Sequence, residues 1–294
     1  MRMKYITQIQ ANLKRYKKIS TNRVTSRILD GSYHSVYKGK SMNFDELREY
    51  VVGDDRKDID WKASARSQKM LVKQYIAEKK HNIMFVMDTN RRMLADTKDL
   101  EEKHETALIS AGTLACLVNQ NGDYVGAIYS TEQSVKHFPF KTGLMNIENI
   151  LEHYHKSVTM QNRSSIDKTL DYIVRNFRRR MILIIVTDME GIREISETTL
   201  KRLLIQHDIL LVRISDADMA GKMVYNMNEE RYLPEFFTSN KKLIKLQEKR
   251  RKAVYKECVE KLKHFGIAIV TIDHRKDIDI KLLELLHKHK YEKR

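Results

Sequence analysis

The fold is decided by the stretch Ile83-Met84-Phe85-Val86-Met87-Asp88, in which five apolar residues in a row end at an aspartate. An apolar run without polar alternation is typical of a strand buried on both faces of a parallel sheet. The pattern returns in Ile184-Ile185-Val186-Thr187-Asp188. Together with weaker runs it predicts strands over residues 83–88, 124–129, 134–138, 181–188, 209–214 and 267–273.

Segments of helical periodicity alternate with these strands, near residues 100–119, 144–155, 164–177, 194–206, 243–264 and 278–290. The first of them ends at Asn121-Gly122, a common signal for the end of a helix. Regular alternation of strands and helices is the pattern of an α/β domain. We therefore predict a doubly wound, mostly parallel sheet flanked by helices.

Two of the predicted strands end in aspartate, Asp88 and Asp188. In open α/β sheets the carboxyl ends of the strands, together with the helix N-termini beside them, form the ligand site. Two carboxylates at neighbouring strand ends would suit a hard cation that prefers oxygen ligands. The candidate site is therefore expected around these two residues.

The chain of 294 residues divides into three predicted segments. Residues 1–22 form a basic amphipathic helix or arm that we expect to dock along the body of the protein. Residues 23–80 form a small annex with short β-like pieces at 33–37 and 70–76. Residues 81–294 form the α/β domain.

The net charge of +16 favours anionic partners, including nucleic acid. Much of the excess lies in two segments, residues 1–30 and 241–264, that have the pattern of amphipathic helices. A basic solvated face on such a helix also serves solubility alone. Nucleic-acid binding is therefore kept as an alternative function.

The sequence shows no apolar leader behind its basic N-terminal residues and no apolar run long enough to cross a bilayer. We therefore expect a cytoplasmic protein. Its two cysteines, Cys116 and Cys258, lie far apart without metal-binding spacing, so both are expected to be reduced thiols.

One charge-dense stretch before the α/β domain carries a family resemblance. It reads Gly53-Asp54-Asp55-Arg56-Lys57-Asp58-Ile59-Asp60-Trp61-Lys62-Ala63-Ser64-Ala65-Arg66, and it follows Phe44 and Arg48-Glu49-Tyr50. This stretch resembles the hallmark of the domain of unknown function 58 family. The matching hallmark positions are Arg48, Gly53, Asp54, Asp55, Arg56, Asp60, Trp61, Ala65 and Arg66.

The resemblance covers about residues 25–290 and implies a von Willebrand factor A-like domain after the hallmark. It also implies a partner, because members typically accompany MoxR-type AAA+ ATPases in chaperone-like or maturation work. The expected function is that of a non-enzymatic adaptor protein.

Von Willebrand A-like domains usually carry a metal site with the pattern D-x-S-x-S, a later threonine and an aspartate after the fourth strand. By this resemblance the first motif reads Asp88-Thr89-Asn90-Arg91-Arg92, and the later positions correspond to Thr142 and Asp188. Both serines are replaced, by Asn90 and Arg92, so the site is degenerate and we expect no metal cofactor.

Arg92 bears most directly on whether a divalent metal ion could bind at this site. At about 5 Å and an effective dielectric near 20, a guanidinium repels a divalent ion by several kcal/mol. Two interpretations of its role stay open. In one, Arg92 forms an ordinary surface ion pair or points to solvent. In the other, it replaces the ion by bridging Asp88 and Asp188.

The hallmark also has competing interpretations. Clustered aspartates could bind catalytic metal in a hydrolase, although no histidine or Glu-x-Lys partner stands beside them. Alternatively Gly53 makes a turn, arginines pair with the acids, and Trp61 is an apolar anchor whose truncation would destabilise the protein. Phosphate-loop, dinucleotide and G-x-S-x-G motifs are missing, so we expect no enzyme activity.

Overall fold

A computed structural model describes residues 3–16, 42–77, 80–218, 220 and 223–292. The chain forms two compact units, one within Tyr33–Lys80 and one that combines Met1–Ser32 with His81–Arg294. The smaller unit ends at residue 80.

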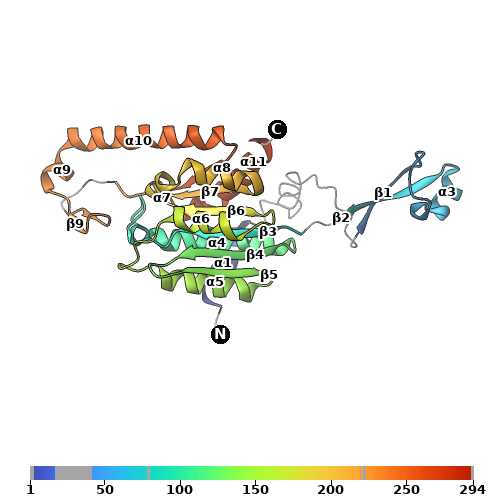
Figure 1. Ribbon diagram of the computed structural model, residues 1–294, viewed down its shortest axis with the longest axis horizontal. Helices are drawn as coiled ribbons and strands as arrows, with labels where there is room; N and C mark the ends of the chain where they lie inside the picture. Colours follow the sequence, from blue (N-terminus) through green and yellow to red (C-terminus); the bar gives the residue numbers. More distant parts are fainter. Residues whose placement is uncertain (1–2, 17–41, 78–79, 219, 221–222, 293–294) are drawn as a thin grey trace. The chain divides into compact units, whose positions relative to one another are not determined.

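The larger unit is built on a six-stranded sheet with the order β10-β7-β6-β3-β4-β5 (Figure 1). Its strands are β3 (Asn82–Met87), β4 (Tyr124–Ser130), β5 (Val135–Lys141), β6 (Ile182–Thr187), β7 (Asp208–Ile214) and β10 (Ala268–Ile272). All neighbours run parallel except β5, which pairs antiparallel with β4. The predicted doubly wound, von Willebrand A-like α/β fold is confirmed.

The strand order places a switch point between β3 and β6. The chain winds outward from β3 through β4 to β5, and then returns to add β6, β7 and β10 on the other side. Connections from β3 and β6 therefore leave in opposite directions, which opens a crevice at the carboxyl ends of these two strands. This crevice is the place where the fold puts a binding site.

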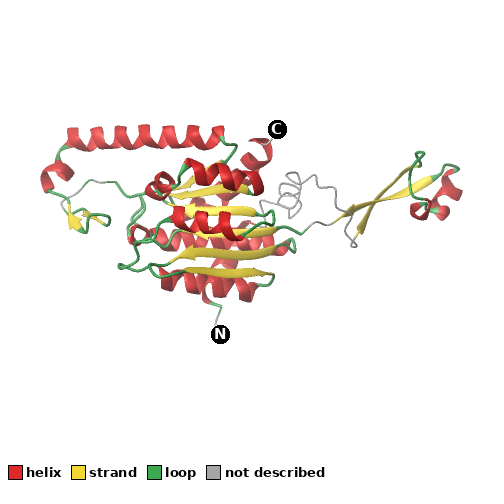
Figure 2. Cartoon of the chain, in the orientation of Figure 1, coloured by secondary structure: helices red, strands yellow, loops and turns green. Residues whose placement is uncertain are grey.

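Helices cover both faces of the sheet, as Figure 2 shows. Helices α6 (Ile166–Asn176), α7 (Met189–Glu194) and α8 (Glu197–Gln206) lie on one face. The other carries α4 (Lys103–Gln120), α5 (Leu144–Ser157) and α11 (Ile278–Glu292). Both faces of β3 and β6 are fully buried, which explains their unbroken apolar sequences. Within the described residues, no helix is both long and apolar enough to cross a membrane.

Helix α1 (Lys4–Tyr16) packs against α4 and α5. Its residues Ile6 and Ile9 are fully buried. Gly112 of α4 allows this close approach, because a Cβ atom there would lie 2.4 Å from Cδ1 of Ile9. The buried carboxylate of Glu148 on α5 accepts hydrogen bonds from the first backbone N–H groups of α1, those of Lys4 (2.8 Å) and Ile6 (2.8 Å) among them.

The C-terminal part of the larger unit carries an extension. A two-stranded hairpin of β8 (Tyr225–Asn226) and β9 (Arg231–Tyr232) is followed by α9 (Glu235–Ser239) and the long helix α10 (Lys241–His264). Along α10 only Leu262, near its end, is fully buried. The helix predicted at 243–264 is confirmed, and most of its length is solvated.

In the smaller unit, β1 (Met42–Glu49) and β2 (Leu71–Ala77) form an antiparallel pair that holds the hallmark segment. Gly53 has a φ of 114°, so it makes the predicted turn. Arg48 donates two hydrogen bonds to Asp54, at 2.8 and 2.6 Å. Asp55 and Asp60 each accept a backbone N–H at the start of a helical turn. The β piece predicted at 33–37 lies outside the described residues.

Trp61 is 66% exposed at the start of α3 (Trp61–Ser67), so the residues of the smaller unit do not bury it, and its role as an anchor against the sheet stays a prediction. One expectation for the hallmark is wrong. Arg56 and Arg66 are exposed, and neither makes an ion pair with an acid of the described residues. The structural role of the segment rests on Arg48, Gly53 and the capping aspartates instead.

We predict that Glu148→Ala loosens α1 from the body. Three backbone N–H groups lose a charged acceptor, so the free energy of unfolding should fall by about 2 kcal/mol. Urea unfolding and limited proteolysis of the first 16 residues would measure the change. Glu152→Ala is the matched control on the same helix, since within the described part of the chain Glu152 forms its one ion pair with Lys156 at the surface. Equal stability of both variants would contradict the prediction.

Candidate functional site

The crevice at the switch point is lined by Asp88, which follows β3, and Asp188, which follows β6. Both side chains are almost fully buried. Oδ1 of Asp88 accepts the backbone N–H of Asn90 at 2.9 Å, and its Oδ2 accepts the Thr187 hydroxyl at 2.6 Å. Oδ1 of Asp188 accepts the backbone N–H of Gly191 at 2.8 Å and so caps α7. Both carboxylates are thus fixed in orientation.

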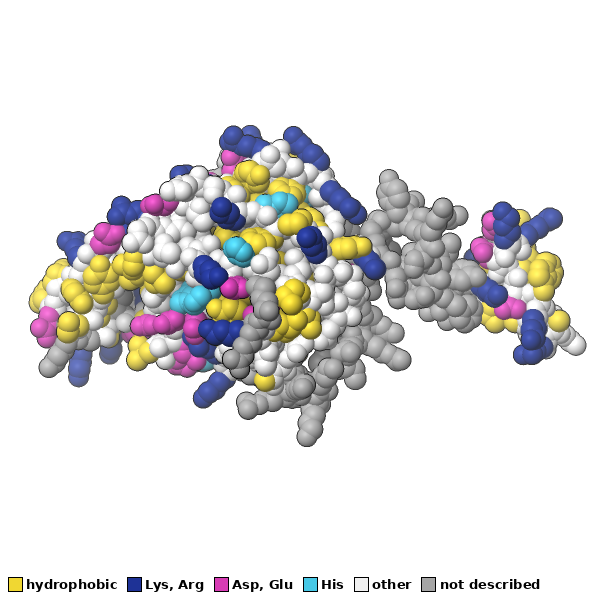
Figure 3. Space-filling view, turned by 90° about the horizontal axis from the view of Figure 1, so that it is seen from below, with side chains coloured by type: hydrophobic (Ala, Val, Ile, Leu, Met, Phe, Trp, Pro, Cys, Tyr) yellow, Lys and Arg dark blue, Asp and Glu magenta, His cyan; other side chains and the backbone are white. Residues whose placement is uncertain are grey.

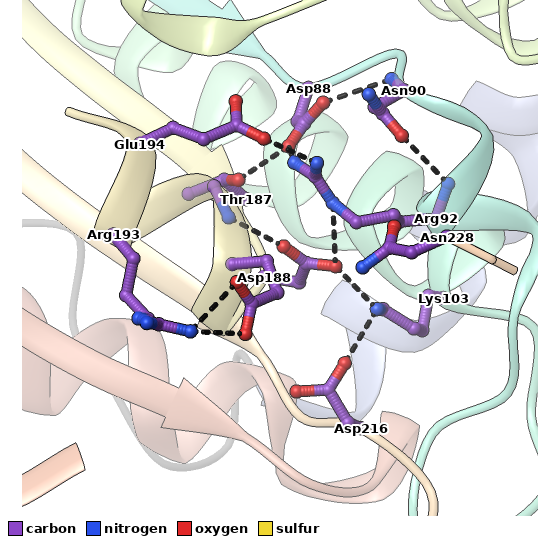
Figure 4. Close-up of polar contacts among 12 residues, drawn as sticks. Asp88, Asn90, Arg92, Lys103, Thr187, Asp188, Arg193, Glu194, Asp216 and Asn228 are labelled. Atoms are coloured by element: carbon purple, nitrogen blue, oxygen red, sulfur yellow. Dashed lines mark hydrogen bonds and ion pairs between the residues drawn. The ribbon is translucent and has the colours of Figure 1, made fainter. Parts of the chain in front are cut away.

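Arg92 lies between the two aspartates (Figure 4). It belongs to the short helix η2 (Arg91–Leu94), and its side chain is only 8% exposed. Its Nη2 lies 3.3 Å from Asp88, its Nε 3.5 Å from Asp188, and its Nη1 2.5 Å from Glu194. Of the two interpretations left open, the geometry matches the bridging one.

Lys103 is a second buried cation at the same place. Its Nζ lies 2.7 Å from Asp188 and 2.7 Å from Asp216, which follows β7. Sequence reasoning missed both Lys103 and Asp216. A signal for Lys103 was present, because a lysine in the first turn of a helix opposes the helix dipole and so needs another reason to be there.

The charges of the cluster fix one another. Although burial opposes ionisation, Lys103 and Arg92 hold the pKa of Asp188 at about 2. Burial and the neighbouring Asp188 raise the pKa of Asp88. Burial also disfavours the charged forms of Arg92 and Lys103, but the surrounding carboxylates raise the pKa of both above the usual values. Both cations therefore stay charged at any physiological pH.

The loop before α6 also borders the site and contacts the residues that follow Asp88. Asn90 donates its side-chain amide to the carbonyl of Ser164 at 2.8 Å, and the Thr89 hydroxyl lies 3.2 Å from that of Ser164. Arg91 donates its backbone N–H to the carbonyl of Asn162 at 2.8 Å. The side-chain amide of Asn90 thus holds the loop before α6, and its side-chain oxygen accepts the backbone N–H of Arg92.

The prediction that Thr142 joins this site is wrong. Thr142 directly follows β5, whose last residue, Lys141, pairs with Val125 at the beginning of β4. Because β5 runs antiparallel to β4, its end lies at the edge of the sheet opposite to the carboxyl ends of β3 and β6. Thr142 is exposed there, and the loop containing Ser164 takes the position at the crevice.

The residues of the crevice do not fit a divalent cation. Two positive groups already lie within 2.7 to 3.5 Å of the two aspartates that would bind it. The replaced serines supply no hydroxyl oxygen, and the oxygen of Asn90 accepts the backbone N–H of Arg92 at 3.1 Å. A metal ion would have to displace two buried cations that already pair with these carboxylates.

A cavity of about 530 Å³ opens beside this cluster. Arg92, Lys103 and Asp188 form part of its wall, together with the turn of the β8–β9 hairpin and one face of α10. Figure 4 shows Asn228, from that turn, beside Arg92 and Lys103. The crevice is thus hollow, and the three cluster residues in its wall, Arg92, Lys103 and Asp188, are already paired.

The hallmark aspartates do not converge on a second site. Asp54 pairs with Arg48, while Asp55 and Asp60 cap different turns. Among the described residues, the metal-type groups that approach one another within 4.8 Å are Glu102, His104 and Glu105 on the larger unit. The geometry therefore does not support a hydrolase site built on the hallmark.

We predict that the wild-type protein gives no specific heat with Mg²⁺ in calorimetry. Asn90→Ser with Arg92→Ser should still fail, because Lys103 continues to hold Asp188. Adding Lys103→Ser should create affinity and lower stability, since the facing carboxylates then lack a cation. Mg²⁺ should raise the melting temperature of this triple variant alone. Specific Mg²⁺ binding by the wild type, lost in Asp88→Ala, would contradict the prediction.

The lowered pKa of Asp188 predicts a pH dependence. The unfolded value is about 3.9, so ionised Asp188 stabilises the fold fully above about pH 5, and this contribution is lost as the pH falls toward about 2. Asp188→Asn should therefore be less stable at pH 7, by about 3 kcal/mol, with the difference shrinking below pH 4.

Chemical unfolding from pH 2.5 to 7 would measure the difference. Asp171→Asn, which breaks a surface pair with Arg175, is the control and should show little difference at any pH. Asp88, whose pKa is raised, acts with the opposite sign, because its contribution is lost as the pH rises. A deficit of Asp188→Asn that stays constant down to pH 2.5 would contradict the prediction.

Comparison with known proteins gives the same assignment as the hallmark. The uncharacterized proteins Mb1516 of Mycobacterium bovis and Rv1480 of Mycobacterium tuberculosis are each 24% identical over 194 residues, which cover 64% of this chain. The match spans 60% of the length of those relatives.

Two solved structures are similar at low identity. BatB from Bacteroides thetaiotaomicron is 14% identical, with 71% of this chain and 98% of that chain covered and a TM-score of 0.43. The SpRpn10 VWA domain is 9% identical, with 68% and 94% covered and a TM-score of 0.36. The family model described as "Protein of unknown function DUF58" matches residues 46–222, more than half of the sequence, and the chain belongs to this family.

Proposed function

We propose that this protein is a non-enzymatic adaptor that binds a protein partner at the switch-point crevice. The observation that carries the proposal is the pair of internal cations: Arg92 and Lys103 stand where a von Willebrand A-like site would take an exchangeable metal ion. Such a crevice keeps one shape and one charge pattern whatever the metal supply. It suits a docking surface that is always ready.

The state of the carboxylates supports a role without catalysis. A general base or metal ligand needs a free lone pair aimed at a reactant. Asp88 is held by Asn90, Thr187 and Arg92, and Asp188 by its capping bond and by both cations. We accordingly propose that the crevice binds and does not react.

The family resemblance names the kind of partner. Members typically accompany MoxR-type AAA+ ATPases, so we propose that such an ATPase, or a client that it remodels, docks on this protein. A partner that hydrolyses ATP would meet it in the cytoplasm. The basic net charge of +16 favours an acidic docking surface on that partner.

Nucleic-acid binding remains the second candidate, because α10 presents many exposed lysines and arginines. A nucleic-acid surface usually concentrates its positive charge along a groove or stripe. The face drawn in Figure 3, seen from the side away from α10, scatters its basic side chains among acidic and apolar ones. We favour protein binding because the buried, fixed cluster lies at the crevice and not on α10.

A direct binding measurement tests the adaptor proposal. The full chain should bind the MoxR-type ATPase of its own host with nucleotide present. Arg250→Glu, on the α10 wall of the cavity, should weaken the complex at least about tenfold, because it sets a negative charge against the acidic surface proposed for the partner. Lys201→Glu on α8, away from the cavity lining, is the control. Binding equal in both variants, or salt-sensitive binding of duplex DNA instead, would overturn the proposal.

A further inference from the structure

The turn of the β8–β9 hairpin lies at the edge of the crevice and is acidic. Its four residues, 227–230, connect the paired residues Asn226 and Arg231. Three of them, Met227, Asn228 and Glu229, form part of the cavity wall beside Arg92 and Lys103. The fourth, Glu230, reaches the body of the domain through its carboxylate.

Two arginines receive this turn. Arg91, next to the bridging Arg92, has a side chain only 8% exposed and forms an ion pair with Glu230. Its Nη2 also donates to the carbonyl of Asn228 at 2.6 Å. Arg163, from the loop before α6, donates to the same carboxylate of Glu230 at 2.8 Å. One carboxylate is thus clamped between two guanidinium groups.

The backbone conformation at residue 230 does not favour a glutamate. Its φ is 53°, in the left-handed region where glycine or asparagine is the usual residue. A glutamate is unfavourable there unless its side chain makes a compensating interaction. The clamp supplies that interaction, so residue 230 is explained by its carboxylate.

The hairpin itself is weakly built. Each strand has two residues, and an isolated two-stranded hairpin is marginal in water. Tyr225 and Tyr232 contact each other across it, but both remain exposed, at 39% and 59%. Among the described residues, the hydrogen bonds and ion pairs that join its turn to the body go to Arg91 and Arg163. Such a segment opens at low cost.

We propose that Arg91 and Arg163 form a carboxylate-binding site for an acidic segment of the protein partner, and that Glu230 occupies this site as an internal substitute until the partner displaces it. This inference rests on the proposed adaptor function and names the chemistry of its ligand. Displacement exchanges one carboxylate for another, so the buried charge of Arg91 stays neutralised at each step. It also uncovers the cavity behind the turn.

The test uses the full-length chain and a fluorescein-labelled hexaglutamate peptide at low salt. Glu230→Gln should remove the competitor and tighten peptide binding by about tenfold or more, as fluorescence anisotropy would show. Hydrogen exchange of residues 223–232 should become faster in the same variant. Glu229→Gln is the matched control, because it removes the same charge from the same turn and Glu229 contacts only Arg231 among the ion pairs described.

A second variant keeps the test independent of folding. Arg163 is 63% exposed, so Arg163→Gln should leave the fold intact and should cancel the gain when combined with Glu230→Gln. Unchanged exchange, or faster exchange without tighter peptide binding, would overturn the inference. So would a gain seen for a labelled duplex oligonucleotide and not for the peptide, since the ligand would then be phosphate. A failed ATPase experiment with a positive peptide result would overturn only the choice of partner.

Discussion

The structure of the crevice depends on one buried interaction, the contact of Arg92 and Lys103 with the carboxylates of Asp88 and Asp188. Two aspartates at the ends of adjacent buried strands would repel each other if both were ionised and unpaired. The cations come from η2 and from the first turn of α4, so these segments must return to the strand ends. Gly191 completes the constraint, because a Cβ atom there would lie 1.9 Å from the Thr187 hydroxyl.

A buried ionic cluster of this kind gives specificity more readily than stability. Removing four charged groups from water is costly, and their mutual attraction roughly offsets that cost when every group is paired. The benefit lies in discrimination: any arrangement that separates the partners leaves a buried charge alone. The cluster therefore fixes one geometry for the loops after β3, β6 and β7, and these loops are the ones a docking partner would meet.

The sequence predicts most of the sheet and part of the site, for physical reasons that differ between residues. Strands such as β3 and β6 are buried on both faces, so their consecutive residues are apolar and the sequence alone reveals them. Asp88 and Asp188 follow from those strands directly. Lys103 joins the site only through tertiary packing. Thr142 was misplaced because the antiparallel direction of β5 carries its end to the other edge of the sheet.

The internal cations change what can regulate the crevice. Where a site of this fold takes a divalent ion, the ion supplies the positive charge that a ligand carboxylate needs, and its concentration can control binding. Here arginine and lysine make that charge permanent, so metal supply has no direct influence. On the proposal above, the contact of Glu230 with Arg91 and Arg163 takes over this role, and the competing group is a carboxylate of the same chain. Partner binding is then controlled by the equilibrium between the closed and open hairpin, and not by the concentration of an ion. A partner can shift this equilibrium only by the difference between its own affinity for Arg91 and Arg163 and that of Glu230.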